Sequence, residues 1–592
     1  MKRWISLVKG GLAPLMFRPQ TRRSVGEVLA RQARRMPEKP LFLFEGRTVT
    51  YREANELANR YAHLFQARGF KKGETVALLM ENRPEFLIIH AGLAKIGVVP
   101  ALLNTHIRGG VLAHAINIVE ARALIVGVEL LEAFEEVKGD VRLESPASLF
   151  LEKEGQTRST PDSMEDLEPS LAGQPVHEPT PDSPMVISDT LEYIYTSGTT
   201  GMPKATVLAH RKWFQLGYAA GGFAVGATSD DVQYVCLPLY HNSGVNLAWP
   251  ITLLWGGTMS LVRRFSVSRF WEDVRRHNAS LFVYVGELCR YLHNLPERPD
   301  DADNPLEIII GNGMRGEYWE AFQKRFAIKR IVEGYASTEG VGGMLNRKGV
   351  PGMIGQLSIA GLIRMGEVAK CDAETGELSL DDKGYCLKCR EGETGMFLAR
   401  VGRLNHFSGY KNNTRATSDK LRNNVFKPGD AYFVSGDLVM LHPKGYLSFV
   451  DRLGDTFRWK GEVVSTNEVG DVLFRFGGME EANVYGVEVA GTEGRAGMAA
   501  VTPLNGADID LDGLAAWVVE KLPSYARPWF LRILDEKAST ATFKQKKVAL
   551  RREGFDPQQI DDRLYFLDPE SRSYVPMTPD LHAGIESGAV RF

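Results

Sequence analysis

The sequence predicts an α/β protein built from layered sheets, with more than one domain. Strand-like and helix-like segments alternate along the first part of the chain: residues 76–80 have the apolar run of a buried strand, and a helix is expected from Glu85 onward. The 592 residues exceed what one hydrophobic core normally holds. Residues 351–400 combine turn residues with short strand patterns, which predicts a smaller β-rich subdomain. We therefore expect a large N-terminal domain of layered α/β sheets plus this subdomain, followed by a small C-terminal α/β domain.

The composition argues against several classes of protein. Hydrophobic residues make up 44% of the chain and charged residues 24%, which is ordinary for a soluble globular protein. The formal net charge of −2 gives no reason to expect a nucleic-acid partner. Five scattered cysteines fit a reducing compartment, so we expect a cytoplasmic protein. Cys371, Cys386 and Cys389 have no fourth metal ligand at suitable spacing, and we interpret them as reduced, structural thiols.

Apolar periodicity assigns the first elements of the chain. Ser24 to Arg35 carries apolar residues at helical spacing, and residues 41–44 and 49–51 are typical of two strands. Glu53 to Gly69 is predicted to be an amphipathic helix that ends at its glycine. The most apolar long run, Phe86 to Leu103, contains two ionisable side chains and two glycines. We interpret it as a buried helix and strand because it falls short of a clear transmembrane span.

The first 23 residues are basic and apolar. They are a poor fit to a secretory signal, because Lys9, two glycines and Pro14 break the apolar run. Two interpretations stay open: a surface segment that contacts lipid headgroups at the inner face of a membrane, and a frayed terminus.

A short aromatic strand, residues 189–195, leads into a run of small residues that suits phosphate. Glycine allows a positive φ and a close approach of the backbone to a ligand, and successive N–H groups in such a turn point into one concavity that suits anionic oxygens. The hydroxyl groups add donors, and the lysine adds positive charge. An exposed, mobile turn is the alternative, and the strand before it and the Pro-Lys pair after it argue against this. The run consists of Thr196, Ser197, Gly198, Thr199, Thr200, Gly201, Met202, Pro203 and Lys204.

Two later strands end in residues that suit a nucleotide. Residues 306–313 form an apolar strand that runs into glycines, and open α/β sheets bind ligands at such strand ends. Residues 331–339 repeat this form. Tyr335 can stack on a purine, and Thr338 can form a hydrogen bond with a phosphate. Glu339 can hold magnesium through a hard oxygen.

Two single residues are further candidates. Asp437 follows a strand-like segment, and its carboxylate can accept two hydrogen bonds from vicinal hydroxyls, as acidic residues do on ribose. The alternative is an aspartate that closes a turn. His241 ends another strand-like segment and is either a core histidine or part of a substrate pocket.

These motifs resemble a known family. The run Tyr-Thr-Ser-Gly-Thr-Thr-Gly-x-Pro-Lys that ends at Lys204 resembles the phosphate-binding loop of the adenylate-forming enzymes, the superfamily of acyl-CoA synthetases and luciferases. Residues 335–339 resemble its Tyr-Gly-x-Thr-Glu motif, with Ala336 where glycine is more usual. Residues 451–468 look like the fatty acid transport protein and very-long-chain acyl-CoA synthetase branch, with Val463 where asparagine is usual.

The resemblance implies a site for ATP, Mg²⁺ and CoA. The loop would hold the β and γ phosphates, and Glu339 and Thr196 would be the metal ligands. The implied C-terminal domain, 453–592, is mobile: it would turn about Gly454 relative to residues 1–452 between two half-reactions. The catalytic residues implied are Lys544, Thr338, Glu339 and His241. Those implied to bind ATP are Thr196, Ser197, Gly198, Thr199, Thr200, Gly201, Lys204, Gly311, Gly334, Tyr335, Ala336, Thr338, Asp437, Arg452 and Arg458, and those on the CoA side are Lys460 and Gly461.

The function implied is that of an ATP-dependent fatty acid–CoA ligase that forms AMP. Its substrate would be a large apolar carboxylic acid, either a long- or very-long-chain fatty acid or a steroid or bile acid. One alternative is a ligase that forms the adenylate but loads a carrier protein. Another is a membrane-associated fatty-acid uptake or binding protein with weak catalysis, which the intact set of candidate residues argues against.

Overall fold

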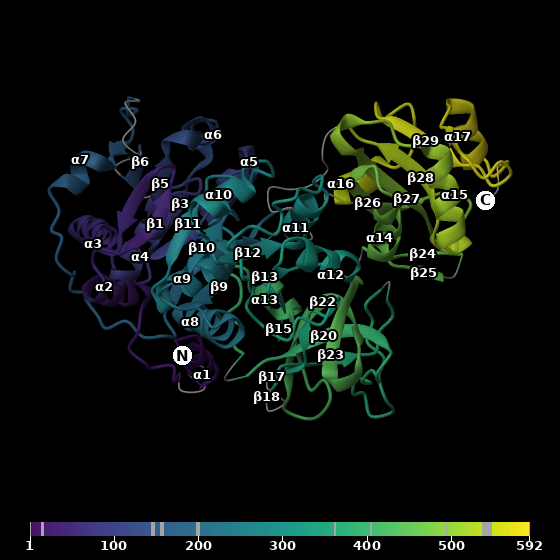
Figure 1. Ribbon diagram of the computed structural model, residues 1–592. Helices are drawn as coiled ribbons and strands as arrows, with labels where there is room; N and C mark the ends of the chain where they lie inside the picture. The colour runs from purple at the N-terminus through teal and green to yellow at the C-terminus, as the bar shows by residue number, and fades with distance from the viewer. Residues whose placement is uncertain are drawn as a thin grey trace. The chain divides into compact units, whose positions relative to one another are not determined.

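The computed structural model divides the chain into two compact units. One comprises Met1–Met365 with Arg400–Arg422, and the other comprises Gly366–Ala399 with Asn423–Phe592. Figure 1 shows the elements of both units. The structure describes residues 2–12, 17–143, 148–153, 159–196, 202–359, 363–373, 375–402, 405–453, 455–460, 462–492, 494–535, 547–590 and 592.

One sheet of the first unit carries the predicted phosphate-loop strand. In the described residues its strand order is β7–β6–β5–β3–β4–β8–β9, and the strands from β7 to β8 pair in parallel. β8 and β9 form an antiparallel hairpin in which Thr196 lies opposite Lys204. The bounds are β3 (Thr75–Leu79), β4 (Val99–Leu102), β5 (Ala123–Gly127), β6 (Leu149–Glu152), β7 (Glu165–Asp166), β8 (Thr190–Thr196) and β9 (Lys204–Ala209).

The second sheet of this unit carries the two predicted nucleotide strands. Its order in the described residues is β15–β14–β13–β12–β10–β11–β1–β2, parallel from β14 to β1 and antiparallel at both edges. Parallel strands bring their carboxyl ends to one edge, so the ends of β12, β13 and β14 lie side by side. The bounds are β1 (Pro40–Phe44), β2 (Arg47–Thr50), β10 (Val232–Val235), β11 (Thr258–Leu261), β12 (Leu281–Val285), β13 (Ile308–Asn312), β14 (Arg330–Tyr335) and β15 (Met344–Asn346).

Helices α2 (Val25–Arg35), α3 (Tyr51–Ala67) and α4 (Pro84–Ile96) pack against one another. A capping box starts α3, because the Thr50 side chain accepts from the Glu53 N–H while Glu53 accepts from the Thr50 N–H. Every residue of α4 is buried, which confirms that the most apolar run contains a buried helix. No helix in the described ranges is both long and apolar enough to cross a membrane.

The N-terminal helix α1 (Lys2–Leu12) packs on the π-helix η5 (Gly217–Val225), so the interpretation as a frayed terminus is wrong. The two helices meet at glycines: a Cβ on Gly10 would lie 2.2 Å from the backbone nitrogen of Phe223. At the other end of α1, Lys2 and Arg3 pair with Asp230 and Asp231 at 2.8 and 2.9 Å.

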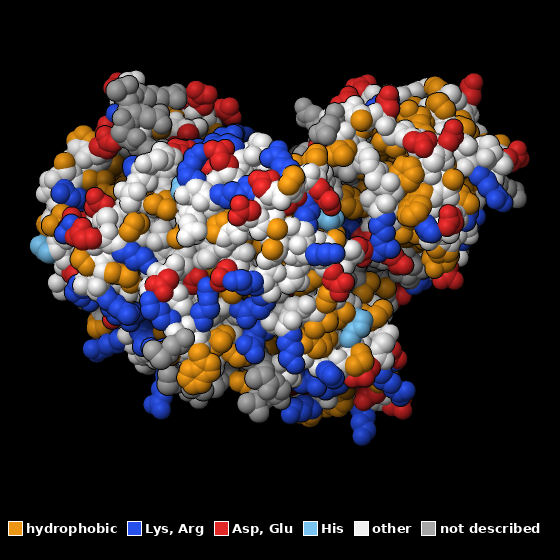
Figure 2. Space-filling model, viewed as in Figure 1, with side chains coloured by type: hydrophobic (Ala, Val, Ile, Leu, Met, Phe, Trp, Pro, Cys, Tyr) orange, Lys and Arg blue, Asp and Glu red, His pale blue; other side chains and the backbone are white. Residues whose placement is uncertain are grey.

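The outer face of α1 is apolar. Trp4, Ile5 and Val8 are 68%, 40% and 41% exposed. Figure 2 shows orange hydrophobic atoms over α1 with blue Lys and Arg atoms around them. Lys9 on the helix and Arg18 and Arg22 after it are exposed as well, so an apolar face has basic neighbours in the chain.

The second unit groups the expected small C-terminal α/β fold with the β-rich segment, which the sequence analysis places with the N-terminal domain. In its described residues one sheet has the order β26–β27–β28–β29–β30, and helix α14 (Thr466–Phe476) contacts β26 and α15 (Leu511–Lys521). Two antiparallel pairs, β19–β20 and β22–β23, precede it. The bounds are β19 (Gly366–Ala369), β20 (Thr394–Arg400), β22 (Ala431–Leu441), β23 (Tyr446–Arg452), β26 (Met479–Glu488), β27 (Arg495–Pro503), β28 (Pro528–Ile533), β29 (Arg563–Leu567) and β30 (Tyr574–Pro576).

Candidate active site

The β8–β9 hairpin presents the ends of the predicted phosphate loop. Thr196 ends β8, Lys204 begins β9, and the two pair across the hairpin. The loop between them, Ser197, Gly198, Thr199, Thr200 and Gly201, lies outside the described residues, as do Gly454, Gly461 and Lys544.

Glu339 is held beside this hairpin by a residue that the sequence reasoning missed. The hydroxyl of Tyr410 donates a hydrogen bond to Glu339 Oε1 at 2.6 Å. Lys204 Nζ lies 5.8 Å from the centre of the Tyr410 ring, which is cation–π range. A lysine, a phenol and a carboxylate therefore form one connected group next to the predicted loop.

Tyr410 reaches this place because its segment extends the edge of the sheet. The N–H of Val207 donates to the carbonyl of Gly409 at 3.0 Å, and the N–H of Lys411 donates to the carbonyl of Ala205 at 2.8 Å. Gly409 has a φ of +84°, a backbone conformation that favours glycine. In the sequence, only the Gly409–Tyr410 pair marks this segment as unusual. Neither residue type indicates that Tyr410 contacts the β8–β9 hairpin.

The ends of β13 and β14 bring Gly311, Gly334 and Tyr335 together. Gly311 pairs with Glu333 in register, and Gly334 and Tyr335 follow on the same strand. A Cβ on Gly311 would lie 2.0 Å from the carbonyl oxygen of Tyr284, so only glycine fits there. Ala336 has no positive φ, and alanine is therefore compatible with this backbone.

A buried carboxylate fixes this strand end, and the sequence reasoning did not single it out. Glu333 accepts hydrogen bonds from the Tyr284 hydroxyl and the Gly313 N–H, both at 2.5 Å, and from the Met314 N–H at 3.2 Å. Its side chain thus joins β12, β14 and the loop after β13. Complete burial raises the pKa of Glu333 to about 8.

His241 lies in a turn that leads into a π-helix, η6 (Ser243–Ala248). Its Nδ1 accepts a hydrogen bond from the Ser243 N–H at 3.5 Å. A Cβ on Gly244 would lie 2.4 Å from the carbonyl oxygen of Pro238, so the turn is tightly packed. Single-turn π-helices are frequent at functional sites.

Thr338 lies in the turn between β14 and Glu339. The Gly340 N–H donates to the carbonyl of Ser337 at 2.9 Å, which closes the turn around Thr338. Thr338 and Glu339 therefore lie on one short turn that follows Tyr335, the last residue of β14.

In the second unit, Asp437 and Arg452 lie side by side. They are register partners across β22 and β23, and Arg452 Nε is 3.7 Å from Asp437 Oδ1. Arg458 pairs with Asp372 at 3.1 Å. Lys460 has a φ of +51° and its ammonium donates to the carbonyl of Phe592.

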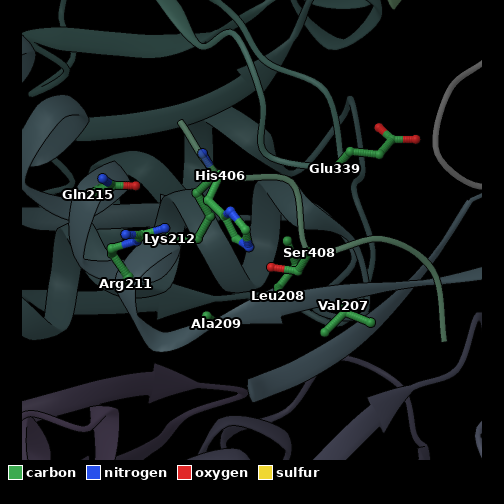
Figure 3. A pocket seen from close by; sticks show the side chains of 9 residues that line it. All are labelled: Val207, Leu208, Ala209, Arg211, Lys212, Gln215, Glu339, His406 and Ser408. Atoms are coloured by element: carbon green, nitrogen blue, oxygen red, sulfur yellow. The ribbon is translucent and has the colours of Figure 1, made fainter. Parts of the chain in front are cut away.

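A cation-lined pocket lies on the other side of Glu339. Figure 3 shows Arg211, Lys212 and Gln215 of α8 (His210–Leu216) on one side, His406 in the centre, and the Glu339 carboxylate pointing away from the two cations. The remaining lining residues are Val207, Leu208, Ala209 and Ser408. Burial lowers the pKa of Lys212 to about 7 and also lowers the pKa of His406.

The residues present fit a magnesium ion carried by a nucleotide. Within the described ranges no group of three or more His, Cys, Asp and Glu side chains could hold a metal alone. Mg²⁺ at phosphate sites commonly takes only one or two protein carboxylates, because phosphate oxygens and water supply the rest. Glu339, fixed by Tyr410, offers such a carboxylate.

A family model for the AMP-binding enzyme matches residues 29–386, and a model for the AMP-binding enzyme C-terminal domain matches residues 468–544. The chain belongs to the AMP-binding enzyme family. This AMP-binding enzyme is 39% identical to long-chain fatty acid transport protein 2 of Rattus norvegicus, over 95% of this chain and 90% of that protein. It is 38% identical to the medium/long-chain-fatty-acid–CoA ligase FadD6 of Mycobacterium tuberculosis, over 96% of this chain and 92% of that protein.

Solved structures share the fold of this AMP-binding enzyme at low sequence identity. The anthranilate CoA ligase AuaEII in complex with anthranoyl-AMP matches with a TM-score of 0.77 and 20% identity, over 91% of this chain and 98% of that one. ATP-bound MatB from Rhodopseudomonas palustris matches with a TM-score of 0.72 and 22% identity, over 89% of this chain and 98% of that one. The α/β architecture expected from the sequence is therefore confirmed as that of adenylate-forming enzymes.

Proposed function

We propose that this chain is an AMP-forming acyl-CoA synthetase that activates a long- or very-long-chain fatty acid with ATP and transfers the acyl group to CoA. A steroid or bile acid is the alternative acyl substrate. The observation that carries the proposal is the relationship to a named medium/long-chain-fatty-acid–CoA ligase along 96% of the chain. The Lys204–Tyr410–Glu339 group beside the phosphate hairpin supports it.

The reaction has two steps. An oxygen of the acyl carboxylate attacks the α-phosphorus of ATP, the bond to pyrophosphate breaks, and an acyl adenylate forms. The sulfur of CoA then attacks the acyl carbon, the bond to AMP breaks, and the thiol proton leaves. Both partners of the first step are anionic, so the site must supply positive charge and aligned donors.

The first unit would supply most of the nucleotide site. Lys204 and the loop from Thr196 would hold the β and γ phosphates, while Tyr335 would stack on the adenine beside Gly311 and Gly334. Glu339 and Thr196 would hold Mg²⁺, which offsets phosphate charge when bound. His241 would lie near the acyl carboxylate.

The remaining roles fall on the second unit. Asp437 would hold the ribose hydroxyls, and Arg452 and Arg458 would meet ribose and phosphate oxygens. Lys544 would bridge carboxylate and phosphate oxygens in the first step. We further propose that residues 453–592 turn about Gly454 relative to 1–452, so that Lys460 and Gly461 replace Lys544 in the second step.

Contact with a membrane surface is part of the proposal. The exposed Trp4, Ile5 and Val8 would enter the headgroup region, since tryptophan prefers this boundary. Lys9 and Arg18, exposed beside them in the chain, would add attraction to anionic lipids.

Pyrophosphate release tests the function directly. The protein would be given ATP, Mg²⁺ and a panel of acids from short to very long chains plus cholate, with and without CoA. Release that depends on long-chain acids, with AMP and acyl-CoA as products, is expected. Release without acyl-CoA, but with transfer to an added acyl-carrier protein, would instead identify a carrier-protein ligase. No release with any acid would favour a fatty-acid binding protein.

A further inference from the structure

The pocket next to Glu339 contains a half-buried cation, Lys212, that has no acidic partner among the described residues. Lys212 Nζ has Asn405 Oδ1 at 3.5 Å, the limit of a hydrogen bond. In the part of the chain that the structure describes, no carboxylate forms an ion pair with it. The neighbouring charge is the guanidinium of Arg211, which is of the same sign.

The same small cavity, about 20 Å³, also has His406 and Gln215 in its wall. A cavity of this size has room for roughly one water-sized group, such as a single ligand oxygen. The acid at its edge, Glu339, is already bonded to Tyr410 and its carboxylate points away from the cations. Burying an ammonium group is costly unless an anion or several hydrogen bonds compensate it. The wall is therefore complementary to an oxygen that brings negative charge.

The methylene groups of Lys212 also pack against neighbouring residues. A test must therefore separate this packing from the effect of the positive charge on ligand binding. A Cβ on Gly340 would lie 2.4 Å from Lys212 Cε, so the methylene groups fill the space under the turn that carries Thr338 and Glu339. Packing alone would be served equally well by an uncharged side chain of the same length.

We propose that Lys212, Arg211 and His406 form a subsite for an oxyanion of the reacting molecules, either the carboxylate of the acyl substrate or a phosphoryl oxygen of ATP or pyrophosphate. The proposal rests on the proposed function, because that function names these two sources. It assigns Lys212 a binding role that none of the sequence motifs includes. Because the stem of Lys212 packs under Gly340, the bound oxygen would lie next to the turn that carries Glu339.

The experiment measures binding by calorimetry to the full-length protein, with two pairs of ligands. Palmitate is compared with hexadecanol, which lacks the carboxylate, and ATP and pyrophosphate are compared with adenosine, which lacks phosphate. The variants are Lys212→Met, which keeps the stem and removes the charge, and Lys212→Arg, which keeps the charge. Lys324→Met, an exposed lysine on α12 (Gly316–Arg325), is the matched control.

Lys212→Met is expected to weaken binding of the oxyanion ligand about tenfold or more, with neutral analogues unchanged. Lys212→Arg should retain most of the affinity, and Lys324→Met should behave as wild type. Loss for palmitate alone identifies the carboxylate as the source, and loss for ATP and pyrophosphate alone identifies the phosphoryl oxygens. Weaker binding of palmitate and of the phosphate ligands together still supports an oxyanion subsite.

Three results would overturn the subsite. The first is that Lys212→Met binds every ligand with unchanged affinity, and the second is that its affinity for the neutral analogues falls equally. The third is that the wild-type protein binds none of these ligands. If Lys212→Met fails to fold, His406→Gln takes its place under the same criteria. Wild-type protein that binds the ligands but releases no pyrophosphate would refute the proposed function, and the binding comparison would still decide on the subsite.

Discussion

The hydroxyl of Tyr410 lies 2.6 Å from Oε1 of Glu339 and donates a hydrogen bond to it, across 71 positions of sequence. The same phenol ring lies under the ammonium of Lys204. Tyr410 therefore connects the base of the phosphate hairpin to the carboxylate that would hold Mg²⁺. A hydrogen bond to a carboxylate fixes its orientation and stabilises its charged form.

Tyr410→Phe should separate this role from packing, because phenylalanine keeps the ring and removes only the hydroxyl. We expect pyrophosphate release to slow by about tenfold, in line with the loss of one hydrogen bond to a charged group, and the Mg²⁺ concentration for half-maximal rate to rise. Tyr446→Phe, a partly exposed residue of β23, is the control. An unchanged Mg²⁺ dependence would contradict the role of Tyr410.

Glu333 should make stability depend on pH. Its pKa is about 8 in the folded protein and 4.5 ordinarily, so between these values the folded state binds more protons than the unfolded state. Stability should therefore fall as pH rises from about 5 to 8, by an amount on the order of a few kcal/mol, and then level off. Glu333→Gln should flatten this fall, measured as the thermal unfolding midpoint against pH. Glu320→Gln, on the exposed face of α12, should keep the wild-type slope, and an equal slope in Glu333→Gln would refute the prediction.

Gly311→Ala should damage the end of β13. The added Cβ would lie 2.0 Å from the carbonyl oxygen of Tyr284, and the strands would have to move apart at a cost of about 1–3 kcal/mol. We expect a lower unfolding midpoint and weaker ATP binding. Gly139→Ala serves as the control, because its Cβ would meet no atom within 4 Å. Wild-type ATP affinity in Gly311→Ala would show that this strand end is not part of the nucleotide site.

Lys544→Ala should divide the two half-reactions. Formation of the acyl adenylate should be abolished, because no cation would bridge the carboxylate and the phosphate oxygens. Thioester formation from supplied acyl adenylate should stay largely intact. The two steps are assayed separately, with Lys521→Ala on α15 as the control. Equal loss in both steps would count against a role confined to adenylation.

Trp4→Ser combined with Val8→Ser should weaken binding to anionic vesicles and leave the fold intact, because both side chains face outward. Sedimentation with vesicles that contain phosphatidylserine is the measurement. Added salt should weaken wild-type binding as well, since it screens Lys9 and Arg18. Binding that ignores both the substitutions and the salt would remove α1 from the membrane proposal.

Local patterns predicted the elements of the site well, and long-range partners badly. The strand–loop–lysine pattern located the β8–β9 hairpin, and the two apolar strands ending in glycines located β13 and β14. Each signal is local: the first runs over residues 189–204, and the second consists of the two short segments 306–313 and 331–339. Tyr410 and Glu333 were missed because their importance comes from what they contact, 71 residues away in one case and in neighbouring strands in the other.

The N-terminal helix shows the same limit. Its composition left two interpretations open, and only the fold places Gly10 against Gly222 and Phe223. The ion pairs of Lys2 and Arg3 with Asp230 and Asp231 likewise join segments that no local pattern links.

This contact has a consequence for synthesis on the ribosome. Helix α1 is made before η5, and the surface on which Gly10 packs is completed only about 210 residues later. At the usual rate of about 5–20 residues per second, the helix would wait roughly 10 to 40 seconds without its partner. During this interval both faces of α1 are open to chaperones or to a nearby bilayer. The nascent chain could therefore meet either of them before η5 (Gly217–Val225) is made.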